Sequence, residues 1–133
     1  MKKLGTIAFA QVQQHPLKVG ERPNRRYEPA PILRVPQMRL TCQGVFGITE
    51  AGDEIIDVHH VDHPQSRNRG NANGISINFL PNYDRLRDRF VARYGGPIAD
   101  GVAGENLVIQ PEADFDMNDI GSEIVIAVAS TGE

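Results

Sequence analysis

The chain has 133 residues, with 14 Lys and Arg against 17 Asp and Glu, one cysteine and no tryptophan. This length fits one compact domain. A single cysteine excludes an internal disulfide framework and any zinc site built from paired cysteines, and it favours a reducing compartment. The early apolar run Ile7–Ala10 is too short for a signal peptide or a membrane span. We therefore expect a cytoplasmic protein that does not enter a membrane.

Charge is distributed unevenly along the chain. Residues 1–40 hold eight Lys and Arg and two Glu, whereas residues 95–133 hold eight acids and no Lys or Arg. Nucleic-acid binding needs many basic residues on one face, and the only basic cluster here lies between Arg22 and Tyr27. We expect no nucleic-acid partner and mutual neutralisation of the two ends in the fold. A phosphate-bearing small ligand near Arg25 and Arg26 stays open.

Most apolar residues alternate with polar ones or form short β-branched runs, which predicts strands. The expected strands are, in chain order, Thr6–Gln13, Ile32–Val35, Met38–Cys42, Val45–Ile48, Ile55–His59, Gly74–Leu80, Leu107–Ile109 and Ile124–Ala129. Alternation within Gly74–Leu80 predicts that Ile75, Ile77 and Phe79 enter the core. Short strands separated by Gly and Pro turns are typical of a largely antiparallel barrel or sandwich. The segments Gly20–Pro31 and Gln65–Gly74 read as loops.

One helix interrupts this β pattern. Apolar residues recur at intervals of three and four from Tyr83 to Tyr94, which predicts one amphipathic helix. Asn82 is its expected N-cap, Asp84 suits its first turn, and Gly95–Pro97 should end it. The fold class expected is therefore mainly β with a peripheral helix, as a single domain over residues 1–133.

The far end of the chain reads as a strand, Ile124–Ala129, followed by a turn, Ser130–Glu133. A turn normally leads into a partner strand, and here it coincides with the last residue. We expect a C-terminally shortened version of a longer domain.

The segment from Asp57 to Pro64 holds three of the four histidines and two carboxylates in eight residues. In an extended chain Asp57, His59 and His63 would point one way and His60 the other. Imidazole and carboxylate bind metals, and imidazole also moves protons near neutral pH. Three interpretations stay open: a metal site, a polar cluster facing an anion or cofactor, and a solvated turn.

Two further features concern the glycine-rich segment and the lone cysteine. Gly101–Leu107 places glycines beside Glu105 and Asn106 before a strand, where backbone N–H groups can face a ligand or Gly104 can simply supply a positive φ. Cys42 lies on the apolar side of the Met38–Cys42 alternation, so we expect a buried structural thiol.

The order of these motifs resembles the MOSC family, the molybdenum cofactor sulfurase C-terminal domain. The resemblance covers residues 5 to 128. It rests on Gln11–Gln13, Gly47 and Gly52-Asp53, Asp57–His60, the Arg67–Arg69 loop leading into Gly74–Leu80, the Tyr83–Tyr94 helix and, most specifically, Gly104-Glu105-Asn106-Leu107.

The resemblance implies a MOSC-like β-barrel that binds the phosphorylated pterin molybdenum cofactor (molybdopterin). The activity implied is sulfur transfer or the reduction of N-hydroxylated compounds, with a redox or sulfur-donor protein as a partner. The family's motif maps the cofactor cleft onto Asp57, His59, His60, Arg67, Arg69, Gly104, Glu105 and Asn106. Family members usually carry a cysteine late in the domain, and here no cysteine follows Cys42, so the catalytic residues are not assigned.

Two alternatives from other classes stay open. One is a metal-binding protein or metal-dependent hydrolase that uses Asp57, His59 and His63. The other is a barrel that binds partners without catalysis.

Overall fold

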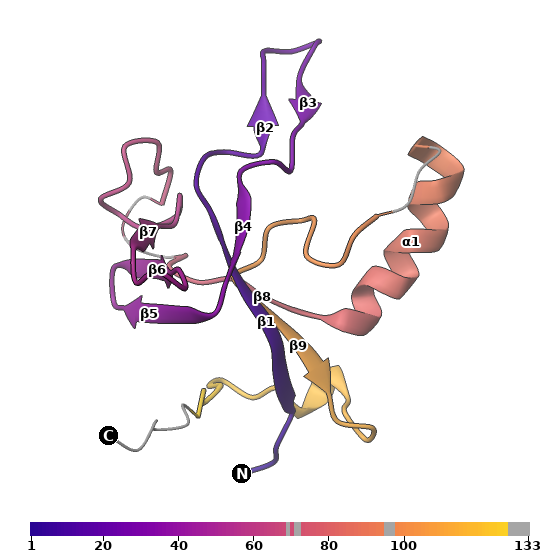
Figure 1. Ribbon diagram of the computed structural model, residues 1–133. Helices are drawn as coiled ribbons and strands as arrows, with labels where there is room; N and C mark the ends of the chain where they lie inside the picture. The colour runs from indigo at the N-terminus through magenta and orange to yellow at the C-terminus, as the bar shows by residue number, and fades with distance from the viewer. Residues whose placement is uncertain (69, 71–72, 95–97, 128–133) are drawn as a thin grey trace.

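The computed structural model of the protein describes residues 1–68, 70, 73–94 and 98–127, and in these it is mainly β with one α-helix (Figure 1). The strands are β1 (Gly5–Gln13), β2 (Lys18–Val19), β3 (Arg26–Tyr27), β4 (Ile32–Val35), β5 (Gln37–Thr41), β6 (Gly44–Ile48), β7 (Glu54–Ile56), β8 (Ile77–Phe79) and β9 (Leu107–Pro111). The helix α1 spans Leu80–Tyr94, and a short 3₁₀ turn, η2, spans Met117–Asp119.

The strands form three sheets that do not close into the expected barrel within the described residues. The central sheet has the order β4-β1-β9-β8, the second is the β2-β3 ribbon and the third has the order β5-β6-β7. Only β8 and β9 run parallel among these pairs. Between β4 and β5 the chain passes from one sheet to another at Pro36, which has no N–H to donate to a ladder. Figure 1 shows the β5-β6-β7 sheet on one side of the central strands and α1 on the other.

The apolar core lies where the central sheet meets the β5-β6-β7 sheet. Val12 of β1, Val35 of β4 and Val45 of β6 are buried together. Gly47 of β6 sits against Val12 and Val35 so closely that a Cβ there would come within 2.8 Å of a Val35 methyl. The absence of a side chain at Gly47 therefore allows the two sheets to approach.

The predicted strands along β1, β4, β5, β6 and β9 are confirmed, but three other predictions need correction. The strand expected over Ile55–His59 ends at Ile56, because the chain turns at Asp57. The expected loop Gly20–Pro31 contains β3, which pairs with β2. Residues 124–127 form no strand, and residues 128–133 lie outside the described residues.

Side-chain burial along Gly74–Leu80 also differs from the expectation. Phe79 is buried and Ile77 is half-buried, whereas Ile75 is exposed because it precedes β8 and lies outside the paired part of the sheet. Leu80 already belongs to α1. The alternation was correct only where the chain has a β partner.

The helix begins three residues before its predicted first residue, at Leu80. Asn82 is therefore inside α1 and is not its N-cap. Asn78 accepts hydrogen bonds from the Phe79 N–H at 2.8 Å and from Asn82 Nδ2 at 2.7 Å, so it organises the start of the helix. Tyr83 is buried as predicted. The predicted apolar side chains of Phe90, Val91 and Tyr94 lie outside the described part of the structure.

No helix among the described residues has the length and the apolar character needed to cross a bilayer.

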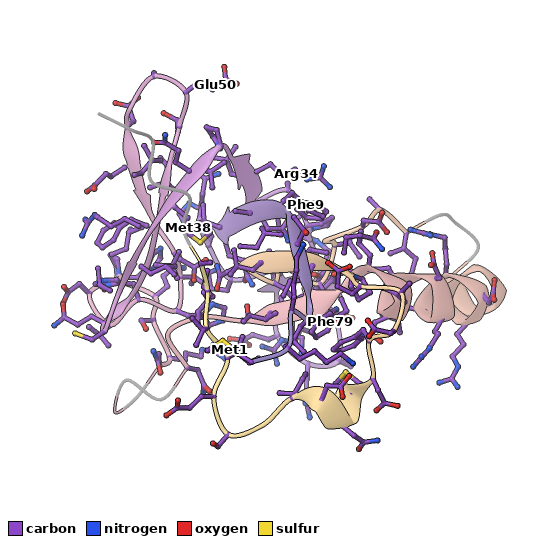
Figure 2. All side chains as sticks on the ribbon, turned by 90° about the horizontal axis from the view of Figure 1, so that it is seen from below. Met1, Phe9, Arg34, Met38, Glu50 and Phe79 are labelled. Atoms are coloured by element: carbon purple, nitrogen blue, oxygen red, sulfur yellow. The ribbon has the colours of Figure 1, made fainter. Side chains whose placement is uncertain are left out.

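The two oppositely charged ends of the chain meet in the fold. Lys2 Nζ lies 2.8 Å from Asp119 Oδ2, and Lys3 Nζ lies 3.0 Å from Glu112 Oε1. Arg34 of β4 covers the ring of Phe9 on β1, with its Cζ 3.7 Å from the ring centroid (Figure 2). The two ion pairs of Lys2 and Lys3 support the expectation that the basic start and the acidic end neutralise each other locally.

Candidate functional site

The segment from Asp57 to Asn68 is a series of tight turns with a period of three residues. The carbonyls of Asp57, His60 and His63 accept hydrogen bonds from the N–H three residues later, at 2.9 to 3.0 Å. The side chains of Asp57, His60, His63 and Ser66 each accept one from the N–H two residues later, at 2.9 to 3.2 Å. Such side-chain caps stabilise turns in place of a ladder. Residues 57, 60 and 63 consequently face the interior, where all three are buried.

The segment is therefore not the extended chain in which Asp57, His59 and His63 would share one side. Nδ1 of His63 accepts from the Gln65 N–H at 3.0 Å, and its Nε2 lies 2.8 Å from the Gln14 carbonyl, to which it must donate. Both ring nitrogens of His63 are therefore engaged within the protein. Nδ1 of His60 likewise accepts from the Asp62 N–H, at 3.1 Å, while its ring packs on Phe46 with centroids 4.6 Å apart.

These two histidines stabilise the turn and do not meet as metal ligands. No group of three or more His, Cys, Asp or Glu side chains capable of holding a metal ion occurs in the described residues.

Asp57 is the centre of a buried polar network. Its side chain is fully buried, and its Oδ2 accepts from the Gln13 N–H at 2.8 Å and from Asn106 Nδ2 at 2.9 Å. Its Oδ1 accepts from the backbone N–H of His59 at 2.9 Å and pairs with His59 Nδ1 at 3.0 Å. One carboxylate thus joins the end of β1, the turn series and the segment before β9.

The ionisation of this pair follows from the same contacts. Burial of Asp57 acts to raise the pKa of its carboxyl, but hydrogen bonds from His59, Gln13 and Asn106 outweigh burial and hold that pKa below its usual value. The hydrogen bond to Asp57 raises the pKa of His59 above its usual value, against the opposing effect of partial burial. His59 therefore keeps a proton more readily than a free histidine does.

The Gly101–Asn106 segment is built into the fold by two buried glutamines of β1. Gln11 Nε2 donates to the Gly101 carbonyl at 2.7 Å, and Gln13 Nε2 donates to the Gly104 carbonyl at 2.8 Å. Gly104 has φ of +86°, so the role expected from the sequence, a positive φ, is confirmed. The backbone of this segment is held from inside the protein.

Glu105 and Asn106 also have partners inside the fold. Glu105 accepts from Asn78 Nδ2 at 2.5 Å and from the Tyr83 hydroxyl. Burial, followed by the Glu105 carboxylate, raises the pKa of Tyr83 well above its usual value. Glu105 thus connects the Gly101–Asn106 segment to β8 and α1.

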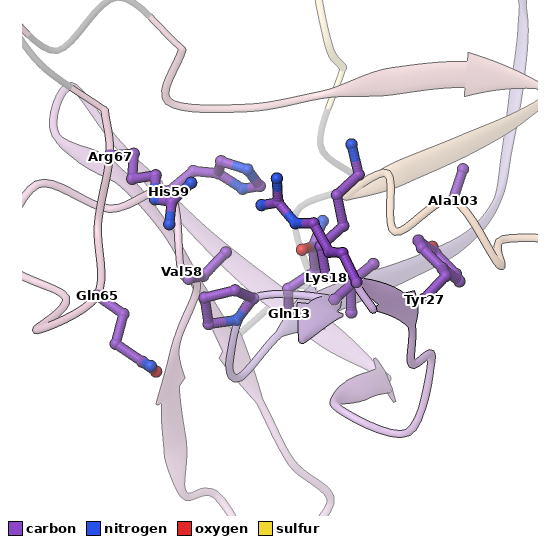
Figure 3. Close-up of a pocket in the computed structure, with 11 residues that line it drawn as sticks. Gln13, Lys18, Tyr27, Val58, His59, Gln65, Arg67 and Ala103 are labelled. Carbon is purple, nitrogen blue, oxygen red and sulfur yellow. The ribbon is translucent and has the colours of Figure 1, made fainter. Parts of the chain in front are cut away.

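A pocket of about 250 Å³ opens beside this network (Figure 3). Its lining residues are Gln13, Pro16, Leu17, Lys18, Arg25, Tyr27, Val58, His59, Gln65, Arg67 and Ala103. Figure 3 shows Arg67 and His59 entering from one side and Lys18 and Tyr27 from the other. No carboxylate belongs to this lining in the described part of the chain. The pocket is therefore basic, with His59 on its wall and Asp57 buried behind that imidazole.

The structure separates the predicted site residues into two groups. His59 and Arg67 line the pocket, whereas Asp57, His60 and Asn106 are buried beneath the surface. Gly104 and Glu105 do not line it, and Arg69 lies outside the described residues.

Sequence reasoning missed Lys18, but it left open a phosphate-bearing ligand near Arg25 and Arg26, and of these two Arg25 lines the pocket. The β2-β3 ribbon brings Lys18 and Arg25 to the pocket, since Lys18 pairs opposite Tyr27. Strands of two residues are too short to show alternation, so no sequence pattern predicted the β2-β3 ribbon. The basic cluster beside Tyr27 was the one available signal.

The prediction that Cys42 is buried was wrong. Cys42 is exposed, in the turn that joins β5 to β6. β5 ends at Thr41, and its apolar face is only partly covered, since Leu40 is also exposed. Cys42 is not among the residues that line the pocket.

No protein-family model, no curated protein and no solved structure matches the chain.

Proposed function

We propose that the protein binds the phosphate group of a small phosphorylated molecule in the pocket described above. The observation that carries the proposal is the lining itself: Lys18, Arg25 and Arg67 converge with His59 around one cavity, without a carboxylate among the lining residues. Phosphate binds to such sites through charge-assisted hydrogen bonds, and arginine offers two parallel donors. All three cations are exposed to solvent, so an anion from solution can reach them.

The remaining walls limit the size and character of the ligand. Pro16, Leu17 and Val58 give the pocket an apolar side, and Tyr27 adds an aromatic ring whose hydroxyl donates to the Val102 carbonyl. A volume of about 250 Å³ lies just below the range of roughly 300–1,000 Å³ usual for drug-sized ligands. We therefore propose a ligand that places a phosphate and one small ring system in the pocket.

The pterin molybdenum cofactor is the candidate that the MOSC resemblance provides, and its phosphate suits the basic side chains. Lys18, Arg25 and Arg67 would hold the phosphate, and His59 would offer a further donor. The cofactor, when bound, supplies redox or sulfur chemistry at its metal. The lining contains no cysteine to ligate that metal or carry sulfur, so we assign this chain the binding step and derive no catalytic step.

The test compares a pterin phosphate monoester with the same pterin lacking the phosphate, by isothermal titration calorimetry. We expect the phosphorylated form to bind more tightly. Replacement of Lys18 and Arg67 by alanine should weaken its binding by about 1.5–3 kcal/mol for each charged hydrogen bond lost, roughly 10- to 100-fold each. The double substitution should leave the affinity for the unphosphorylated pterin nearly unchanged.

The matched control is Lys3→Ala with Arg89→Ala, which also removes one lysine and one arginine. Lys3 pairs with Glu112, and Arg89 is exposed on α1; neither lines the pocket. If both double variants bound the pterin phosphate equally weakly, only the net charge of the protein would matter, and the proposed site would be refuted. Equal binding of both pterins would refute phosphate recognition.

A further inference from the structure

The imidazole of His59 has one ring nitrogen committed to the protein and one available to the pocket. Nδ1 pairs with Asp57 Oδ1 at 3.0 Å, and that carboxylate is fixed by three other donors. The ring itself lines the pocket (Figure 3). Because Asp57 is ionised and accepts at this contact, Nδ1 carries a proton. His59 can then donate from Nε2 only as an imidazolium.

The charged and hydrogen-bonding groups around His59 come from every element that forms the pocket. They are Lys18 on β2, Arg25 between β2 and β3, Tyr27 on β3, Arg67 and Gln65 on the turn series, and Asp57 directly behind the ring. Glu105 lies in the segment that contributes Ala103, and its carboxylate bonds to Asn78 and Tyr83. Asp57 favours a proton on His59. An anion bound among Lys18, Arg25 and Arg67 would lie close to the imidazole and favour that proton further.

We infer that anion binding in this pocket is coupled to proton uptake by His59, which holds the ligand through Nε2–H while Nδ1–H stays on Asp57. The inference rests on the proposed function, because it concerns the same pocket. It makes His59 a specificity-determining residue: the site gains a fourth cationic donor where the ligand brings a full negative charge. The hydrogen bond that raises the pKa of His59 supports the same conclusion.

Sulfate is the suitable probe, because it remains a dianion from about pH 5.5 to about pH 8.5, where phosphate and histidine both titrate. Its affinity would be measured by calorimetry at constant ionic strength. We expect the logarithm of the association constant to fall with pH, with a slope approaching about −1 between the pKa of His59 in the free protein and its higher pKa in the complex. His59→Gln should bind about 10- to 100-fold more weakly at the acidic end and lose this slope.

A second measurement does not depend on a variant. The pKa of His59, followed by its imidazole NMR signals in the unsubstituted protein, should rise when sulfate is added, because linkage is reciprocal. Sulfate binding with no dependence on pH, or an unchanged His59 titration, would overturn the inference and leave the phosphate pocket standing. Absence of binding by both sulfate and the pterin phosphate at every pH would overturn the pocket and the inference together.

Discussion

At the scale of single residues, Asn106 connects three parts of the chain through one amide. Its Nδ2 donates to Asp57 Oδ2 at 2.9 Å and to the Gln11 carbonyl at 3.2 Å, and its Oδ1 accepts from the Ser76 N–H at 3.1 Å. The residue is 1% exposed, so water cannot replace these partners. Asn106 is therefore a structural residue, although the family motif had mapped it to the cofactor cleft.

We predict that Asn106→Ala lowers the free energy of unfolding by about 2–4 kcal/mol, because it leaves a buried carboxylate and a buried carbonyl each short of a donor. Urea unfolding measures the change. Asn118→Ala is the control, since the Asn118 side chain is exposed in the middle of η2 and the expected effect is within about 0.5 kcal/mol. A loss of similar size in both variants would show that Asn106 has no special place in the fold.

The role of a residue was predictable from the sequence where it depends only on neighbouring residues in the chain. The positive φ of Gly104 followed from its place before a strand, and the importance of Asp57–His63 followed from its density of polar groups. The direction of the side chains could not be predicted, because alternation with a period of two assumes a ladder. Here His60 and His63 close turns with a period of three. Only their contacts with Gln14, which follows β1, and Phe46 of β6 show which way they face.

At the scale of elements, the Gly101–Asn106 segment is a rigid connector. Gln11 and Gln13 hold its carbonyls from β1, and Glu105 ties it to α1 through Tyr83. A Cβ on Gly104 would lie 2.8 Å from Leu17 Cδ1, and a residue there would also keep the unfavourable φ of +86°. Gly52 has a similar φ of +88° but no atom within 4 Å of its hypothetical Cβ.

Gly52 and Gly104 have nearly the same strained φ, but only Gly104 has close neighbours, so substitutions at the two positions distinguish backbone strain from steric contact. We predict that Gly52→Ala costs about 1–2 kcal/mol of stability from φ alone. Gly104→Ala should cost about 2–4 kcal/mol, because overpacking against Gln13 and Leu17 adds to that strain. Thermal and urea unfolding of the two variants give the comparison. Equal losses would mean that the segment moves freely enough to admit a methyl group.

Elements with a continuous pattern were predictable, and short ones were not. β1, β4 and β6 are four to nine residues long and carry apolar or β-branched residues at most positions, which is the pattern that predicts a strand. β2 and β3 hold two residues each and depend on their mutual pairing. The helix start at Leu80 was missed because Asn78 organises it from within β8, before Pro81 and Asn82.

At the scale of the whole molecule, the mainly β class followed from composition and alternation, whereas the pocket did not. Lys18 is far in sequence from His59 and Arg67, and it reaches them only because the Gln14–Leu17 segment, which joins β1 to β2, lies against the turn series. Val58 N–H donates to the Gln13 carbonyl at 2.8 Å at this junction. Contacts of this kind depend on tertiary packing, which no local pattern encodes.

The Asp57–His59 pair also makes the stability of the whole molecule depend on pH in two directions. Asp57 has a folded pKa below its ordinary value of 3.8, so its contribution is present above that value and is lost as the pH falls through the lowered pKa. His59 has a folded pKa above its ordinary value of 6.5, so its contribution is full below that value and is lost as the pH rises through the raised pKa. The pair therefore stabilises the fold most between these two ordinary values.

We predict that the unfolding free energy contributed by this pair is largest at about pH 4–6.5 and declines on both sides. Urea unfolding from about pH 3 to about pH 9 measures it, in a range below the raised pKa values of Tyr27 and Tyr83. The curve of His59→Gln, subtracted from that of the unsubstituted protein, leaves the alkaline decline alone. The curve of Asp57→Asn, subtracted in the same way, leaves the acidic and the alkaline declines together. Exposed pairs such as Arg39–Glu54 are unchanged in every variant and cancel in the subtraction. An alkaline decline that persists undiminished in His59→Gln would assign it to another group and contradict the ionised pair.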